Sequence, residues 1–386
     1  MSEQPVAYGK TIERALARVL ERLPERLDPE ALAAVCDELD IRPPHQQRLL
    51  ARNSGRAGRL EVCWELVRQA EALRFSDPRA MCRRAEVAIA VAEGLSDDAG
   101  PSSLVEDVRA EAWACLANAH RVAGDLRAAD RAWANAERHL AEGTCDPLLA
   151  ALVARLKGTL RLDQLQLEEA IDLLSKALAT YRKLGEGGLA GRTAVSLGVA
   201  HGRAGNLEQA IRSTLEGGRL LNRLKEPALV LGALRNLVLY LHHAGCTEHA
   251  ASLLERLRGL FELAPQDLEL LRLRWLEGKI SAALGKQVEA RAALNAVRRE
   301  FLAKGMLYDG ALVALELAAL YAEAGWTSEV EKLAEEMYPV FVSRDLPREA
   351  SAALLLFVDA VNRRAASAEY IRKLAADLSA KREAKS

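Results

Sequence analysis

The chain has 386 residues, of which 50% are hydrophobic and 28% are charged, so it can bury a large core and lacks the composition of a disordered protein. Its formal net charge of −1 gives no general reason to expect nucleic-acid or membrane binding. Aromatic residues make up only 4%, and the apolar content is mainly alanine and leucine, which favours helices over a β-rich core. Because one core seldom grows to this length, we expect several domains or an elongated stack.

The cysteines and the N-terminus indicate the compartment. The six cysteines include no pair with C-x-x-C spacing, and most fall inside apolar helical segments, which is typical of buried thiols in a reducing cytosol. Residues 11–23 carry charges at every turn, unlike a signal peptide. The densest apolar run, residues 352–358, is far too short to span a bilayer. We therefore expect a soluble, cytoplasmic protein.

Residues 1–55 are predicted to form a separate N-terminal helical segment. Asp28 before Pro29 is a good helix start, because the aspartate caps the helix and proline fits its first turn. The helical patterns of this segment cover about 10–23, 29–39 and 45–52.

Residues 56–94 are predicted to form one degenerate helical hairpin, and the polar loop 95–103 after it is the best internal boundary. The first helix of the hairpin has one apolar face, on which the spacing places Trp64, Leu66, Val67, Ala70 and Leu73.

A fixed spacing dominates the rest of the chain. Gly205, Gly245, Gly285 and Gly325 lie 40 residues apart, and each stands between two helical apolar patterns. Such a period predicts stacked helical hairpins, because one hairpin cannot bury its apolar face without its neighbours. Residues 104–340 hold six such hairpins, and in the second of them Leu165 replaces the turn glycine. Residues 341–386 are predicted to add capping helices at about 347–363 and 366–381.

The informative positions of the hairpins resemble those of the tetratricopeptide repeat (TPR). The resemblance covers about 104–340 and implies a right-handed α-solenoid whose first helices, the A helices, line a concave groove. The period of 40 residues exceeds the roughly 34 of the standard repeat and is similar to long repeats of bacterial signalling and regulatory proteins. In the first hairpin the family order is carried by Trp113, Leu116, Ala117, His120, Gly124, Ala129, Trp133 and Ala136.

The resemblance also implies which side chains line the groove. Asn236 occupies a position where TPR domains commonly hold a peptide backbone, and arginines beside it would favour carboxylates. The A helices at about 189–204 and 228–244 contain no Asp or Glu, which predicts a local basic stripe. The alternative is that these are ordinary solvated charges in an arginine-rich chain. The predicted groove residues are Arg192, Arg203, Arg235, Asn236, His243, Arg272, Trp275 and Lys279.

Catalytic and metal-binding patterns are absent from the sequence. His242 and Cys246 have the i, i+4 spacing of two ligands on one helical face, but Gly245 interrupts the helix between them. Gly185–Gly188 lacks the lysine of a phosphate loop, and no Gly-x-Ser-x-Gly occurs. We therefore expect neither an enzyme nor a cofactor or metal site.

The sequence favours a non-catalytic scaffold or adaptor that binds a protein or peptide, with an acidic segment suited to the stripe. One alternative is a sensory or transcriptional regulator with residues 1–52 as its effector, and another is a regulatory subunit of an enzyme. The acidic residues Asp37, Glu38 and Asp40 and the Pro43-Pro44 break make a poor DNA-recognition helix, so no nucleic-acid partner is expected. The partner's identity, the pathway and the oligomeric state are left open by the sequence.

Overall fold

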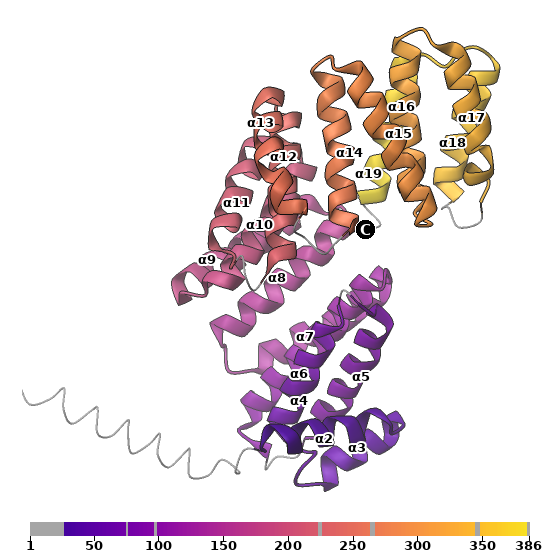
Figure 1. Cartoon of the computed structure of the whole chain (residues 1–386). Helices are drawn as coiled ribbons and strands as arrows, with labels where there is room; N and C mark the ends of the chain where they lie inside the picture. The colour runs from indigo at the N-terminus through magenta and orange to yellow at the C-terminus, as the bar shows by residue number, and fades with distance from the viewer. Residues whose placement is uncertain are drawn as a thin grey trace, which may run out of the picture. The chain divides into compact units, whose positions relative to one another are not determined.

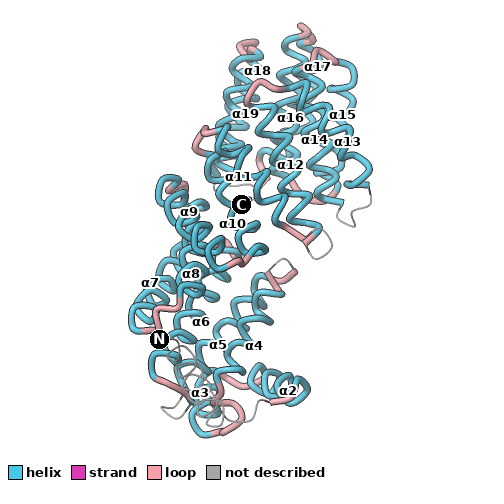
Figure 2. The backbone as a smooth tube through the Cα atoms, turned by 90° about the vertical axis from the view of Figure 1, so that its left-hand side faces the viewer, coloured by secondary structure: helices cyan, strands magenta, loops and turns pink. Residues whose placement is uncertain are grey.

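The structure, a computed structural model, describes residues 27–74, 76–95, 99–222, 226–262, 267–343 and 348–383. Within these residues the chain consists of α-helices joined by short turns and contains no β-strand (Figure 2). The all-α fold class predicted from the sequence is confirmed. None of the described helices is both long enough and apolar enough to cross a membrane. The helix predicted at about 10–23 lies outside the described residues.

The chain divides into two compact units, residues 1–156 and 157–386. In unit 1 most helices pack on their neighbours in sequence, α4 on α5, α5 on α6 and α6 on α7, while α3 packs on α5 (Figure 1). The described helices of unit 1 are α2 (Pro29–Asp40), α3 (Pro44–Asn53), α4 (Leu60–Ala72), α5 (Pro78–Gly94), α6 (Ser102–Val122) and α7 (Leu126–Glu142), and α8 (Pro147–Asp163) crosses the boundary.

Three helices of unit 1 begin at an aspartate that caps them. Asp28, Asp77 and Asp125 each accept a hydrogen bond from the backbone N–H three residues later, at 2.7, 2.9 and 2.9 Å. Such a cap satisfies a donor that the first turn of a helix leaves without a partner. The helix start predicted at Asp28 is therefore confirmed.

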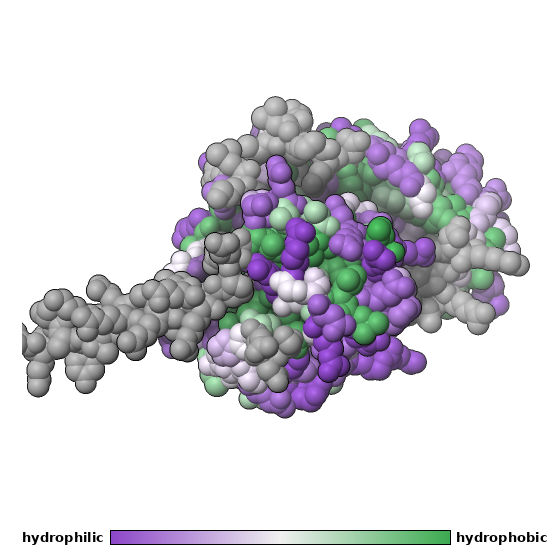
Figure 3. All heavy atoms as spheres, turned by 90° about the horizontal axis from the view of Figure 1, so that it is seen from below, coloured by the Kyte–Doolittle hydropathy of each residue, from purple (hydrophilic) through white to green (hydrophobic). Residues whose placement is uncertain are grey.

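Trp64 does not lie where the apolar pattern placed it. Leu66, Val67 and Ala70 are buried as expected, but the Trp64 side chain is 42% exposed. Other exposed apolar side chains lie near α3, including Ile41 and Leu49. Seen from below, the described residues mix hydrophobic and hydrophilic side chains on one face (Figure 3).

The 40-residue period is confirmed in the helix boundaries. The A helices α8, α10, α12, α14 and α16 begin at residues 147, 187, 227, 267 and 307. The B helices that follow them begin at 167, 207, 247, 287 and 327. The helices of unit 2 are α9 (Leu167–Leu184), α10 (Gly187–Arg203), α11 (Leu207–Leu220), α12 (Pro227–His243), α13 (Thr247–Glu262), α14 (Asp267–Ala283), α15 (Gln287–Ala303), α16 (Leu307–Glu323), α17 (Thr327–Phe341), α18 (Arg348–Asn362) and α19 (Ala368–Glu383). The division into segments predicted from the sequence stays a prediction.

The turn inside each repeat is left-handed. Gly205, Gly245, Gly285 and Gly325 have φ between 72° and 78°, and Leu165 adopts φ 60° at the equivalent turn. A side chain at Gly285 would meet no atom within 4 Å, so the requirement for glycine there is conformational rather than spatial. Leu165 therefore accepts a backbone strain that the glycines avoid.

The last helix departs from the position that a further regular repeat would give it. Helix α18 packs on α17, and α19 packs on the A helix α16. The Tyr308 hydroxyl of α16 donates to the Leu378 carbonyl oxygen of α19 at 2.8 Å, and Arg372 pairs with Glu323. As a result α16 is covered by α15, α17 and α19, which explains why its apolar side chains are buried nearly all round.

Candidate partner-binding surface

The predicted groove residues come together on three successive A helices of unit 2. Helix α12 packs against both α10 and α14, so these helices present one continuous surface, which we call the A-helix face. It is made of Arg192 and Arg203 on α10, Arg235, Asn236 and His243 on α12, and Arg272, Trp275 and Lys279 on α14.

Carboxylates join the arginines of this face from one repeat to the next. Arg192 pairs with Glu226, which stands just before α12. Glu269 accepts from Arg235 Nε at 3.1 Å and from Arg272 Nη1 at 2.8 Å, so it bridges two arginines. All three of these side chains are at most 30% exposed. The Glu269 bridge therefore fastens α12 to α14.

Lys279 and Trp275 share a carboxylate in the same way. Lys279 Nζ lies 3.1 Å from Glu316 Oε1, and Trp275 Nε1 donates to Glu316 Oε2 at 2.5 Å. The Trp275 ring is only 9% exposed and packs edge-on against Phe301. Trp275 is therefore a core residue that positions Glu316, and its ring offers little surface to a partner.

Of the three remaining residues of the A-helix face, one makes a hydrogen bond within the protein and two do not. The Arg203 side chain is 13% exposed and donates to the Leu162 carbonyl oxygen at 3.1 Å, which ties α10 to the end of α8. Asn236 is half-buried and His243 is exposed, and neither side chain makes a hydrogen bond to another described residue. Their polar atoms can therefore serve a partner.

The expectation of a local basic stripe needs correction. Arg192, Arg235, Arg272 and Lys279 all have carboxylate partners, so the face is not a run of uncompensated positive charge. Two of these carboxylates lie outside the residue ranges predicted for the A helices, because Glu226 precedes α12 and Glu269 lies in the first turn of α14. Had each A helix been predicted to begin where the 40-residue period places it, the range for α14 would have included Glu269.

The histidines at the end of α12 are kept neutral at neutral pH. Burial lowers the pKa of both His242 and His243, and the nearby Lys279 ammonium lowers it further. Glu316 opposes this effect at His242. In the part of the chain that the structure describes, no group of three His, Cys, Asp or Glu side chains is placed to hold a metal ion.

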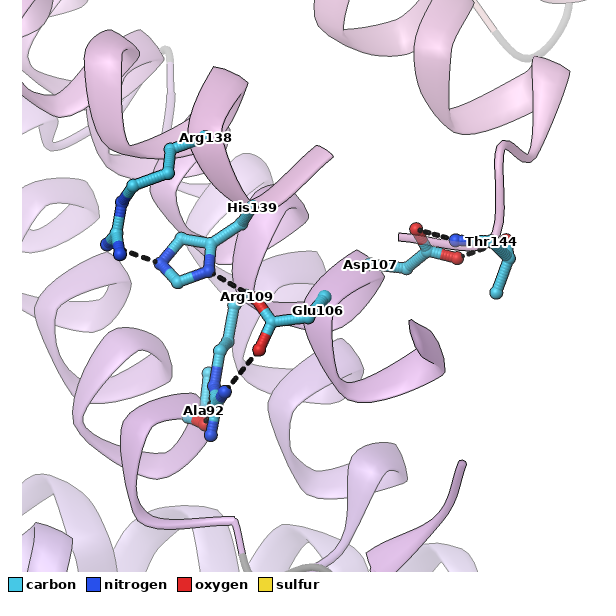
Figure 4. A network of polar contacts seen from close by, with 7 residues as sticks. All are labelled: Ala92, Glu106, Asp107, Arg109, Arg138, His139 and Thr144. Atoms are coloured by element: carbon cyan, nitrogen blue, oxygen red, sulfur yellow. Dashed lines mark hydrogen bonds and ion pairs between the residues drawn. The ribbon is translucent and has the colours of Figure 1, made fainter. Parts of the chain in front are cut away.

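Unit 1 contains a buried polar network that the sequence did not indicate (Figure 4). His139 Nδ1 lies 2.5 Å from Glu106 Oε2, and Arg138 Nη2 donates to His139 Nε2 at 3.0 Å, so the Nδ1 proton points to Glu106. Arg109 joins Glu106 to the Ala92 carbonyl oxygen of α5. Although burial raises the pKa of Glu106, its bonds to His139 and Arg109 outweigh that and lower it. The network joins α5, α6 and α7 and serves stability.

No protein-family model matches the chain. No curated protein matches it either. Among solved structures, a Rap protein in complex with competence and sporulation factor is 14% identical with a TM-score of 0.50, over 87% of this chain and 100% of that one. Aspartyl phosphate phosphatase F from Bacillus subtilis is 12% identical with a TM-score of 0.48, over 89% of this chain and 98% of that one.

At such low identity the likeness concerns the fold alone. The first of these structures is similar over its full length to the helical hairpins described above. The chain has a tetratricopeptide-like helical-repeat fold, an α-solenoid. The TPR resemblance drawn from the sequence is thereby confirmed.

Proposed function

We propose that this protein is a non-enzymatic scaffold or adaptor that binds a protein or peptide segment along the A-helix face of unit 2. The observation that carries the proposal is the Asn236 amide, which makes no hydrogen bond to other described residues and directly follows Arg235, the arginine that Glu269 bridges to Arg272. An amide can both donate to a peptide carbonyl and accept from a peptide N–H. The similar Rap protein was crystallised with a bound factor, which supports this class of partner.

The chemistry of the face favours an acidic segment. Arg235 and Arg272 use only one nitrogen each towards Glu269, and a guanidinium has five N–H donors. A carboxylate of the partner can therefore join Glu269 at the same two arginines. Because these side chains are partly exposed, the affinity is expected to fall as salt rises.

A peptide-display library selected on the full chain tests this proposal. We expect enriched peptides to carry Asp or Glu, and Arg235→Glu with Arg272→Glu to weaken them at least about tenfold, since both charge contacts are reversed. The control is Arg212→Glu with Arg219→Glu, which makes the same charge change on exposed residues of α11. Equal binding to both double variants, with helical content unchanged, would move the partner away from this face.

A regulatory protein is a second candidate. The observation in its favour is that α2 and α3 belong to unit 1, whereas the A-helix face belongs to unit 2, so binding and output would have separate sites. Hydrogen exchange of residues 29–53 with and without a selected peptide tests it. Protection that changes in this segment would favour a regulator, and protection confined to unit 2 would favour a plain scaffold.

A further inference from the structure

The turn between α16 and α17 carries an exposed aromatic side chain that a cation covers. Trp326 directly precedes α17 and is 44% exposed. The guanidinium carbon of Arg291 on α15 lies 4.4 Å from the centroid of the Trp326 ring, and the Tyr321 ring of α16 stacks on the same indole at a centroid distance of 5.9 Å. Val288, three residues before Arg291 on α15, is 70% exposed. We call Val288, Arg291 and Trp326 the Arg291–Trp326 site.

The polar groups of this site make no polar contact with the rest of the described chain. Arg291 forms neither an ion pair nor a hydrogen bond with a described residue, and the indole N–H of Trp326 has no acceptor among them. Glu289 and Glu329 are close to these residues in sequence but do not pair with Arg291, and Glu329 accepts from the Ser328 hydroxyl at 2.9 Å. Since a guanidinium has five N–H donors, the site offers an unpaired cation beside an unused N–H donor.

The chain contains a similar combination with a carboxylate bound to it. Lys279 Nζ lies 5.9 Å from the centroid of the Trp275 ring, and Glu316 contacts both residues. One oxygen of Glu316 is 3.1 Å from Lys279 Nζ, and the other accepts from Trp275 Nε1 at 2.5 Å. A carboxylate therefore matches a cation and an indole N–H that are held together, and a guanidinium binds it more specifically than an ammonium does.

The earlier repeats show that the fold does not require this site. The positions of Trp326 and Val288 hold polar, charged or small side chains there, namely Gln166, Asn206, Cys246 and Lys286 at the first and Glu168, Glu208 and Glu248 at the second. Asn206 has φ −81° and ψ 65°, close to the −88° and 67° of Trp326, so the turn forms equally well without an indole. Tryptophan and arginine are the residue types that most often supply binding energy at interfaces.

Charge and apolar surface together indicate the occupant. The Arg291 cation favours an acidic group, and Val288 lies one helical turn away on the same side of α15, where it suits an apolar side chain. The donors of the site belong to side chains, whereas the terminal carboxylate of a chain is typically held by backbone N–H groups. An acidic side chain within a segment therefore fits better than a chain end.

We propose that the Arg291–Trp326 site binds a segment of a partner protein through the carboxylate of one Asp or Glu side chain, with an apolar residue of the segment, one or two positions away, on Val288. The proposal does not rest on the A-helix face, because α15 and the turn before α17 lie outside that face.

The test uses the full chain with Arg235→Glu and Arg272→Glu, so that the A-helix face no longer selects acidic peptides. A library of twelve-residue peptides is selected on this variant, and each enriched peptide is made with a free and with an amidated C-terminus for fluorescence anisotropy. We expect the peptides to share an Asp or Glu with an apolar residue one or two positions away. Exchange of that acidic residue for its amide should weaken binding at least about tenfold, and amidation of the C-terminus less than about twofold.

Substitutions taken from another repeat test the site at little risk to the fold. Trp326→Asn and Val288→Glu introduce the residues that stand at these positions before and in α11, and each should weaken binding about tenfold, the first by loss of the indole and the second by charge repulsion. Arg291→Ala should weaken it at least about tenfold. The matched control is Arg299→Ala, an exposed arginine of the same helix, which should change binding less than about twofold.

Three results would overturn the proposal. They are enriched peptides without an acidic residue, equal binding by Arg291→Ala and Arg299→Ala, and binding that amidation of the C-terminus abolishes, which would make this a site for chain ends. The indole N–H resonance of Trp326, identified by its loss in Trp326→Asn, should shift when peptide is added. Because the selected variant already has the charges of the A-helix face reversed, failure at this site leaves the proposed function untouched, and the reverse also holds.

Discussion

The two units use the same kind of helix surface in opposite ways. Five residues before the leucine of the repeat motif, unit 2 has Arg192 before Leu197, and unit 1 has Glu111 before Leu116. Arg192 pairs with the carboxylate of Glu226 near the start of the next A helix. Glu111 on α6 makes no ion pair with a described residue, and burial together with the carboxylates of Asp107, Asp146 and Glu71 raises its pKa. An equivalent position in a repeat can therefore either fasten neighbouring repeats or hold a carboxylate without an ion-pair partner.

The sharpest test of this contrast replaces one glutamate by glutamine in each unit, Glu269 in unit 2 and Glu111 in unit 1. Glu269→Gln leaves Arg235 and Arg272 facing each other without a carboxylate, and we expect it to lower the free energy of unfolding by about 1–2 kcal/mol, because the three side chains are mostly shielded from water. Glu111→Gln should leave the free energy of unfolding unchanged or raise it, because it removes an unbalanced carboxylate.

Urea denaturation at neutral pH, with the two units followed separately by hydrogen exchange, measures both effects. The buried-network residue Glu106 gives a control within unit 1, since Glu106→Gln disrupts bonds to His139 and Arg109 and should destabilise. If Glu111→Gln lowered the free energy of unfolding as much as Glu106→Gln does, Glu111 would be part of the packing of unit 1 and not an unbalanced charge.

The pH dependence of stability should separate the two carboxylates of unit 1. The folded pKa of Glu111 is raised, so ionising it costs stability as pH rises through the unfolded value of about 4.3 towards the folded value. The folded pKa of Glu106 is lowered, so its contribution is present above the unfolded value and is lost as pH falls through the folded one.

Denaturation of the two variants from about pH 3 to pH 7 checks these signs. Relative to the wild type, Glu111→Gln should gain stability as pH rises, and Glu106→Gln should lose it. Parallel curves for the two variants would contradict the assignment of an unbalanced charge to Glu111. The comparison needs no absolute stability, because each variant is referred to the wild type at the same pH.

The sequence predicted the repeats well because their physical cause is local. A left-handed turn favours glycine, and small residues are needed where helices approach, so a side-chain carbon at Gly278 would come within 2.8 Å of Leu294. These requirements recur every 40 residues and are visible in one chain. Leu165 shows that the backbone keeps the turn even where glycine is missing, at φ 60°.

The surfaces were predicted less well because their charges meet only across helices. The partners of the arginines come from neighbouring repeats, as Glu269 does for Arg235, 34 residues along the chain. Trp64 has the spacing of a core residue, and only the packing of α4 on its neighbours leaves it exposed. Which residues of the A-helix face contact a partner stays a prediction, although the burial of Trp275 argues against a direct contact there.

The smallest expected effect is the response of the A-helix face to acid. Because burial and the nearby Lys279 lower the pKa values of His242 and His243, these histidines take up protons only below the usual range of histidine, where they add positive charge beside Lys279. An acidic peptide should therefore bind the A-helix face more tightly in acid than at neutral pH. Anisotropy titrations with a selected acidic peptide, at neutral pH and in acid, measure the change, and replacing both histidines by glutamine should abolish it. Equal affinity of the wild type for the acidic peptide at neutral pH and in acid would mean that the two histidines add no charge to this face.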